Sequence, residues 1–409
     1  MVLSNRLGRR LTVCLAAGVL SVAFLAGGCQ KPQWDDPKYM VKQLKEGTAT
    51  RRRMALNKFD QLPEDKIRLV VPGLVKVYMD GGVNQEEAME KLVQHPSSKA
   101  QKAYLKEIRE NNAGKAGAAA DALGQTKTRE AVPQMLKIFK KTNDPDIMLG
   151  IVKGFVHMPD ATMVDPLVNA LELDVDNYPI AIHSYSCDVL GEIAQKSPGA
   201  LDEKAKRALV RAQYLSNVKG QNLSKPCGLA IQKLGQPAVP ILVETFKGKN
   251  EQVNALMRKY NKPDKYQFPE NRAKVKAIQR LVTLRAEEAI DLFIEDLKEE
   301  KKAPKQLTGN HAVSWRKFEG QAIDEMILGL GDLQAEKARP LLEDILRGEY
   351  DTDEWDELTD WSVSLQLRQD AAFSLVRLGG SKSNDALFDM AMEGVITDLE
   401  RRARYLEAK

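Results

Sequence analysis

The sequence of 409 residues is poor in the side chains that bind metals or act as nucleophiles, with four histidines and four cysteines. The histidines are isolated from one another, and neither His-Glu-x-x-His nor Cys-x-x-Cys occurs, so metal-ligand spacing is missing. A Gly-x-Ser-x-Gly nucleophile elbow and a glycine-rich phosphate loop are missing as well. The sequence therefore predicts no catalytic residue, no metal and no cofactor, and a protein that is not an enzyme.

Two local patterns match only part of a functional motif. Ser216-Asn-Val-Lys219 has the Ser-x-x-Lys spacing of penicillin-binding active sites, but no Ser-Asp-Asn or Lys-Thr-Gly follows, which favours a chance match. The acidic stretch 351–360 lacks the central glycine and final glutamate of a calcium-binding loop, which favours a solvated loop. His183 falls on a predicted helix, where a structural histidine is the default expectation.

Positive and negative charges nearly balance over most of the chain. The formal net charge is +4, but residues 1–28 hold three of the 61 basic residues and none of the 57 acidic ones, so the remainder is close to neutral. A neutral chain gives no electrostatic case for a nucleic-acid partner. The compact basic run Arg51-Arg52-Arg53 is expected to be a solvated helix face.

Aromatic residues make up only 6% of the chain, and alternating β-branched runs are rare, whereas leucine, alanine, lysine and glutamate are abundant. This composition predicts an all-α fold. The length exceeds that of an ordinary single domain, so either two domains or a repeat array is expected.

Long apolar runs are missing except for residues 11–26, which follow Arg6, Arg9 and Arg10 with no acidic residue nearby. The run is short for a membrane span, and small residues follow it, which is typical of a secretory signal peptide. The segment Leu25-Ala26-Gly27-Gly28-Cys29 resembles the bacterial lipobox, although its leucine stands four places before the cysteine instead of three.

The lipobox resemblance implies that residues 1–28 are a signal peptide and that the Cys29 sulfur carries a diacylglyceryl (palmitate-type) anchor, followed by a short linker over residues 29–44. Acyl chains would hold the protein on a bilayer without a transmembrane helix. By analogy with Gram-negative lipoproteins, Gln30 favours the outer membrane. The alternative is ordinary secretion, with Cys29 incidental.

After removal of the signal peptide and acylation of Cys29, two thiols would remain, Cys187 and Cys227. Each falls in a predicted helix of neighbouring repeat units. They could form a disulfide in an oxidising compartment, or they could be two small buried apolar residues at helix contacts.

A sequence motif recurs along the chain. In this motif one helix ends in Leu-Gly, and Ala-(Val)-Pro-x-Leu begins the next helix. Glycine accepts the left-handed conformation that closes a helix, and proline lacks only an N–H that the first helical turn leaves unpaired. The clearest copy has Leu234-Gly235 and Ala238-Val239-Pro240. Two further copies are complete: Leu123-Gly124 with Ala131-Val132-Pro133, and Leu330-Gly331 with Ala338-Arg339-Pro340. Only the second half occurs at Pro72 and Pro166, and copies without proline occur at Leu281 and Leu378-Gly379.

The repeat unit is about 33 to 50 residues long and has two helices, which resembles the HEAT repeat and its bacterial HEAT-like variants. A tetratricopeptide array is the nearest competitor, but its strict period and Trp-Leu-Gly-Tyr pattern are absent. The resemblance covers residues 45–395 and implies a right-handed α-solenoid of HEAT/armadillo-like type, in which stacked units bury each other's apolar stripes. Residues 396–409 are expected to be a C-terminal helical cap or tail.

Long connections between units distinguish the C-terminal half, at residues 247–271, 299–317 and 348–360. In a two-helix solenoid such connections emerge on one edge, where insertions often bind partners. The candidate partner-binding residues are the aromatic ones in or beside these insertions: Tyr266, Phe268, Trp315, Tyr350, Trp355 and Trp361. The alternative is that they fold back over helix ends.

Taken together, these patterns predict a membrane-anchored lipoprotein that serves as a non-enzymatic protein-binding scaffold in the bacterial cell envelope. Its partners would be envelope proteins of unknown identity and the membrane itself, with no nucleic acid. One alternative is an enzyme or enzyme accessory, similar to the HEAT-like bilin lyases, with an unrecognised site on the concave face. Another is a purely structural envelope protein.

Overall fold

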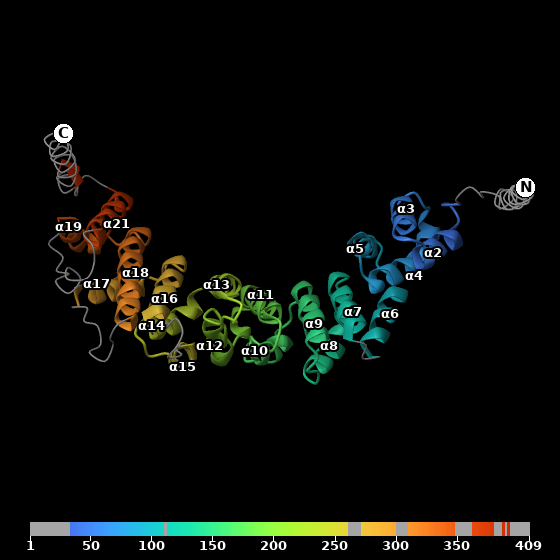
Figure 1. The fold of residues 1–409 in the computed structure, drawn as a ribbon, viewed down its shortest axis with the longest axis horizontal. Helices are drawn as coiled ribbons and strands as arrows, with labels where there is room; N and C mark the ends of the chain where they lie inside the picture. The colour runs from blue at the N-terminus through green and yellow to red at the C-terminus, as the bar shows by residue number, and fades with distance from the viewer. Residues whose placement is uncertain are drawn as a thin grey trace, which may run out of the picture. The chain divides into compact units, whose positions relative to one another are not determined.

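The computed structural model describes residues 33–109, 113–260, 271–299, 310–347 and 362–379, with short helical pieces at 387–388 and 391–392 (Figure 1). These residues form 19 α-helices and no β-strand, which confirms the predicted all-α fold. Within this part of the chain, no helix has both the length and the apolar character needed to cross a bilayer. The helices divide into two compact units, with the boundary between Thr128 and Arg129.

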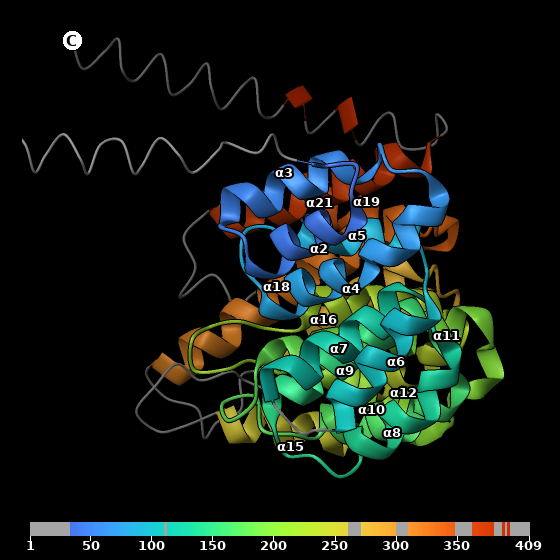
Figure 2. The ribbon, with the colours of Figure 1, turned by 90° about the vertical axis from the view of Figure 1, so that its right-hand side faces the viewer.

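The first unit is built around α4, which contacts α2, α5, α6 and α7 (Figures 1 and 2). α3 packs on α2, and α6 packs on α7. The helices of this unit are α2 (Pro37–Glu46), α3 (Ala49–Phe59), α4 (Glu64–Asp80), α5 (Gln85–Gln94), α6 (Ser98–Arg109) and α7 (Ala113–Gln125).

The second unit contains the remaining helices in two sets. In the first set, each helix packs on the next: α9 on α11, then α13, α16, α18 and α21. In the second set, α10 contacts α12 and α12 contacts α14. The helices are α8 (Val132–Phe139), α9 (Pro145–His157), α10 (Val164–Leu171), α11 (Ile180–Lys196), α12 (Glu203–Ala212), α13 (Ser224–Leu234), α14 (Val239–Phe246), α15 (Glu251–Tyr260), α16 (Asn271–Thr283), α17 (Glu288–Lys298), α18 (Asn310–Asp332), α19 (Arg339–Arg347) and α21 (Ser362–Leu378).

Helices begin at the Ala-x-Pro motifs as predicted, but a short 3-10 turn precedes each of these helices. The turns are Arg129–Ala131, Gln236–Ala238 and Glu336–Ala338, and each ends on a completely buried alanine. The proline is then the second residue of α8, α14 or α19. At this position a missing N–H leaves no intrahelical hydrogen bond unmade.

The interpretation of Pro72 as the start of a helix is wrong. Pro72 lies inside α4, which begins at Glu64 directly after Pro63. The buried residues Ile67, Val70, Val71 and Leu74 form one stripe that continues past the proline. Tertiary packing of this stripe outweighs the backbone hydrogen bond that an interior proline removes.

The predicted linker over residues 29–44 includes part of a packed helix. α2 begins at Pro37, where the Asp36 side chain accepts a hydrogen bond from the Lys38 amide at 3.0 Å. Met40 and Leu44 are completely buried, and α2 packs on α4. The predicted boundary of the repeat region at residue 45 therefore lies inside α2.

The predicted closure of helices by Leu-Gly holds at some copies and fails at others. Gly235 and Gly379 have φ values of 71° and 70°, in the left-handed region that glycine accepts easily. Gly124 and Gly331 instead lie inside α7 and α18. Each of these helices ends one residue later, at Gln125 and Asp332, so the predicted left-handed closure by Gly124 and Gly331 is wrong although the helix ends lie beside them.

Three helices end in one recurring turn that the sequence pattern did not reveal. In each turn a left-handed residue stands four places after the leucine of the repeat, and the next amide donates back to that leucine's carbonyl, as in a Schellman motif. The left-handed residues are Lys127 at 51°, Arg285 at 51° and Gln334 at 55°; the hydrogen bonds are Thr128 N to Leu123 O at 2.9 Å, Ala286 N to Leu281 O at 3.0 Å and Ala335 N to Leu330 O at 3.0 Å.

Glycine inside the helices lets neighbouring helices approach closely. A Cβ atom built on Gly331 would lie 2.7 Å from the Cα atom of Ser374 in α21. A Cβ atom on Gly191 of α11 would lie 2.8 Å from the Cα atom of Ala230 in α13. Both distances are shorter than van der Waals contact with backbone atoms, so these crossings require glycine.

The two cysteines lie at the same crossing as Gly191. Cys187 of α11 and Cys227 of α13 form a disulfide, with their Cα atoms 5.0 Å apart. Both side chains are completely buried. The crossing is thus held by close backbone packing and by a covalent bond one helical turn away.

We expect Gly331→Ala to lower the free energy of unfolding by about 1 to 3 kcal/mol, because the added methyl group would overlap the α21 backbone. Urea unfolding followed by circular dichroism measures the change. Gly199→Ala is the matched control, because no atom lies within 4 Å of a Cβ placed there. Equal stability of the two variants would contradict this account of the α18–α21 crossing.

Candidate functional site

The connections from one helix pair to the next meet on one edge of the second unit. The Val218 amide of the α12–α13 connection donates to the Asp176 carboxylate of the α10–α11 connection at 2.8 Å. The Ser216 amide donates to the Tyr260 hydroxyl at 3.0 Å, and Lys259 pairs with Asp174 at 3.5 Å. We call residues 172–179, 213–223 and 247–260 the connection rim.

A compact turn builds the middle of the connection rim. Ser216 and Asn222 form an isolated antiparallel bridge, and the Asn217 carboxamide oxygen accepts hydrogen bonds from the amides of Lys219 and Gln221. The Ser216 hydroxyl donates to the Gln221 carbonyl at 3.2 Å. The Ser-x-x-Lys pattern therefore coincides with a folded turn in which the serine hydroxyl stabilises the backbone.

His183 joins the rim to α11. Its ring is completely buried, and Nε2 lies 3.0 Å from the Leu173 carbonyl oxygen. Burial lowers the pKa of His183, because the charged imidazolium is disfavoured away from water. These contacts fit the structural histidine that the sequence indicated.

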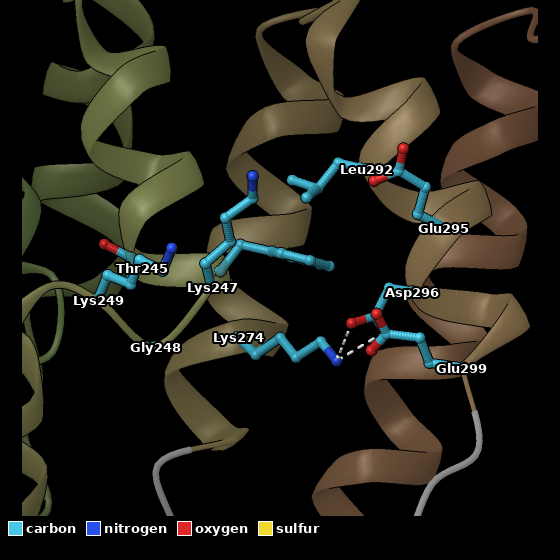
Figure 3. Close-up of a pocket in the computed structure, with 10 residues that line it drawn as sticks. Thr245, Lys247, Gly248, Lys249, Lys274, Leu292, Glu295, Asp296 and Glu299 are labelled. Carbon is cyan, nitrogen blue, oxygen red and sulfur yellow. Dashed lines mark hydrogen bonds and ion pairs between the residues drawn. The ribbon is translucent and has the colours of Figure 1, made fainter.

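A cavity of about 520 Å³ lies at the end of the rim, between α14, α16 and α17 (Figure 3). One wall is the end of α14 and the turn after it, residues 245–249, where Gly248 has a φ of 65°. The opposite wall is α17, and Lys274 of α16 reaches across between them. The lining residues on this side are Leu292, Glu295 and Asp296 of α17 and Glu299, which directly follows it.

Lys274 is the centre of a largely buried charge network at this cavity. Its ammonium nitrogen lies 2.7 Å and 2.9 Å from the two Asp296 carboxylate oxygens (Figure 3). It also lies 3.2 Å from Glu319 Oε1 in α18. The side chains of Lys274, Asp296 and Glu319 are 13%, 15% and 5% exposed. The same ammonium lies 5.0 Å from the centre of the Phe246 ring. Lys274 of α16 thus contacts residues of three other helices, α14, α17 and α18.

The mouth of the cavity carries both signs of charge. Lys247 and Lys249 are exposed on the α14 side, and Glu295 and Glu299 are exposed on the α17 side. Small-molecule sites are usually enclosed and mostly apolar, with few polar groups. The polar, two-sign lining here suits contact with another polar surface.

The cavity lies where two of the predicted insertions join the described helices. Residues 261–270 connect α15 to α16, and residues 300–309 connect α17 to α18. Of the candidate aromatic residues, Trp315 lies in the N-terminal part of α18, and its side chain is outside the described residues. The other candidates, Tyr266, Phe268, Tyr350, Trp355 and Trp361, lie outside the described residues, as do Cys29 and the acidic stretch 351–360.

The sequence did not indicate the Lys274 network. Lys274 stands between Ala273 and Val275, which are both buried, and this placement was the available signal. A lysine on a helix is usually solvated, however, so its flanking residues alone do not reveal partners on two other helices.

Another group of acidic side chains has raised pKa values. Burial, the nearby Asp370 and Glu325 together raise the pKa of Asp324 in α18 to about 6. Burial also raises the pKa of Asp370 in α21. These residues do not line the cavity between α14 and α17. The described residues contain no group of three or more His, Cys, Asp or Glu side chains placed to hold a metal ion.

No protein-family model matches this chain, and a search of curated proteins finds no match to it.

We expect Lys274→Met to lower the free energy of unfolding by about 3 kcal/mol, because removing the ammonium leaves the largely buried Asp296 and Glu319 without this counter-charge. Denaturant unfolding measures the loss. Lys247→Met, an exposed lysine of the same cavity, should change stability by less than about 0.5 kcal/mol. A Lys274→Met protein as stable as the control variant would show that the network contributes nothing.

We expect Asp324→Asn to stabilise the protein at pH 7.5 by on the order of 1 kcal/mol, allowing for solvent screening of a half-buried group. The pKa of Asp324 is higher in the folded chain than in the unfolded chain, so its stabilising contribution is complete at acid pH and disappears as pH rises through about 6. The gain should therefore vanish below about pH 4. Unfolding at several pH values tests this, with exposed Asp344→Asn as control; a pH-independent gain would contradict it.

Proposed function

We propose that this chain is a bacterial lipoprotein, anchored through Cys29, whose HEAT-like α-solenoid serves as a protein-binding scaffold in the cell envelope. It works by binding and not by catalysis. The proposed site of the anchor is the outer membrane, and the proposed binding surface is the connection rim together with its insertions.

The observation that carries this proposal is the gathering of successive inter-pair connections on one edge of the second unit. A stack of two-helix repeats produces this arrangement, because every chain return to the next pair emerges on the same side. The recurring left-handed turns at Lys127, Arg285 and Gln334 support the same reading, since repeated units should end their helices alike. The proposed solenoid therefore presents one continuous edge to a partner.

The composition of that edge favours a protein partner. The rim cavity has lysines on one side and glutamates on the other, which suits a polar, charge-matched surface. The three predicted insertions of the C-terminal half add aromatic residues in or beside them, and tryptophan and tyrosine are common anchors of protein interfaces. These residues are Tyr266, Phe268, Trp315, Tyr350, Trp355 and Trp361.

The proposed export and anchoring rest on the sequence and on the cysteine pair. Disulfides persist in oxidising compartments outside the cytosol, so the Cys187–Cys227 bond is in keeping with an exported protein. The eight residues from Cys29 to Asp36 span at most about 28 Å, which would keep the first helix close to the bilayer.

Crosslinking in intact cells grown with a palmitate analogue tests both parts of the proposal. We expect the analogue to label the protein at Cys29, and mass spectrometry of the purified lipoprotein to recover a reproducible protein partner. The double variant Trp355→Ala and Trp361→Ala should bind that partner about 30-fold more weakly, the loss typical of a central interface anchor.

Phe373→Ala provides the matched control, because Phe373 is an aromatic side chain that is 61% exposed on α21, outside the connection rim. It should leave partner recovery unchanged. Undiminished labelling of a Cys29→Ala variant would refute the anchor. Recovery of no reproducible partner would refute the scaffold function, and full recovery with the double tryptophan variant would refute partner binding through Trp355 and Trp361.

A further inference from the structure

The helices α2 and α3 carry charge of almost one sign, although the chain as a whole is nearly balanced. Residues 37–59 contain seven lysines and arginines and a single acidic residue, Glu46. α3 contains no acidic residue at all. This hairpin therefore has a local positive charge that the overall composition conceals.

The lysines of α2 lie on its exposed side. Lys38, Lys42 and Lys45 follow one another at helical spacings of four and three residues, and all three are exposed. The opposite side of the helix buries Met40 and Leu44 completely. Packing of that apolar side against α4 holds the three ammonium groups toward solvent.

α3 adds further positive charge and an apolar side chain. Arg51 and Arg53 are exposed, and Met54, which follows Arg53 directly, is 50% exposed. Leu56 and Phe59 are completely buried and fix the opposite side of the helix. The exposed side of α3 thus combines cations with one apolar side chain.

Most of these cations form no ion pair with a carboxylate of the residues that the structure describes. Arg52 is the exception, since it pairs with Asp80 of α4 at 3.3 Å. Lys58 donates to the Gln61 carboxamide. The remaining five form no ion pair with a described carboxylate: Lys38, Lys42, Lys45, Arg51 and Arg53. These five residues are called the basic patch below.

Two aromatic residues stand at the start of the hairpin. Trp34 and Tyr39 pack edge to face, with their ring centres 5.3 Å apart. Aromatic rings with one polar atom are enriched at the boundary between lipid tails and water. A basic patch beside such a pair has the composition of a surface that rests on lipid headgroups.

We propose that the basic patch of α2 and α3 binds the anionic phospholipid headgroups of a bilayer. Its orientation toward the membrane rests on the proposed anchor at Cys29, from which α2 is separated by a tether of at most about 28 Å. Fixed positive charges close to an anionic bilayer are attracted within about one Debye length, near 8 Å at physiological salt. The acyl chains hold the protein at the membrane, and the patch sets which side of the first unit faces it.

Vesicle binding by the chain from Gln30 onward, made without the signal peptide and therefore without acyl groups, tests the patch alone. The probe is a vesicle of phosphatidylcholine with about one third phosphatidylglycerol, compared with phosphatidylcholine alone. We expect binding to the anionic vesicle only, and its loss in about 1 M salt, where the Debye length falls to about 3 Å. Each basic residue contributes roughly a factor of five in partitioning, so Lys38→Gln with Lys42→Gln and Lys45→Gln should weaken binding on the order of 100-fold.

Three other exposed lysines provide a matched control, Lys137, Lys140 and Lys141 at the end of α8. Their change to glutamine removes the same charge from the second unit and should leave vesicle binding unchanged. Replacing the three α2 lysines by arginine should also preserve it. A second patch variant, Arg51→Gln with Arg53→Gln, should weaken binding independently of α2.

Equal binding to neutral and anionic vesicles, equal loss in the α2 and α8 variants, or unchanged binding by both patch variants would overturn this proposal. These outcomes are separate from those that test the anchor. Vesicle binding without palmitate labelling at Cys29 would refute the anchor alone, and labelling without vesicle binding would refute the patch alone.

Discussion

The structure depends on side-by-side packing of helices from neighbouring helix pairs, because a helix pair with one apolar stripe cannot bury that stripe by itself. In the second unit this packing brings backbones so close that glycine is required, at Gly191 against Ala230 and at Gly331 against Ser374. The cost of glycine inside a helix, about 1 kcal/mol relative to alanine, is offset by the contacts that the close approach permits. The order of the helices, and the edge on which the chain returns, follow from this packing.

The charged groups of the second unit are organised by the same packing. Lys274 contacts residues of three neighbouring helices because α16 lies between α14 on one side and α17 and α18 on the other. Asp324 and Asp370 come together because α18 packs on α21, and their mutual repulsion adds to burial in raising the pKa of Asp324. Neither group needs a ligand to explain its position. The connection rim is held together by polar contacts as well, since backbone amides of one connection donate to side chains of its neighbours.

Much of the local structure could be predicted from the sequence, since helix boundaries depend on residues close together in the chain. Pro133, Pro240 and Pro340 marked helix starts because proline at this position needs no neighbours. Gly331 was misread because a glycine for close packing and a glycine for a left-handed turn look alike in sequence, and the left-handed position went to Gln334. The Lys274 network depends on residues 22 and 45 positions away, which no local pattern connects. The aromatic candidates of the rim remain predictions.

The bond between Cys187 and Cys227 closes a loop of 40 residues, and cross-links of this span restrict the unfolded chain by about 4 kcal/mol. Such a bond forms only where thiols are oxidised, so one sequence has two stabilities that depend on the redox conditions. Under reducing conditions the α11–α13 crossing is held by non-covalent packing alone, and the chain is easier to unfold. Under oxidising conditions the bond ties the two helices together and opposes unfolding of the chain.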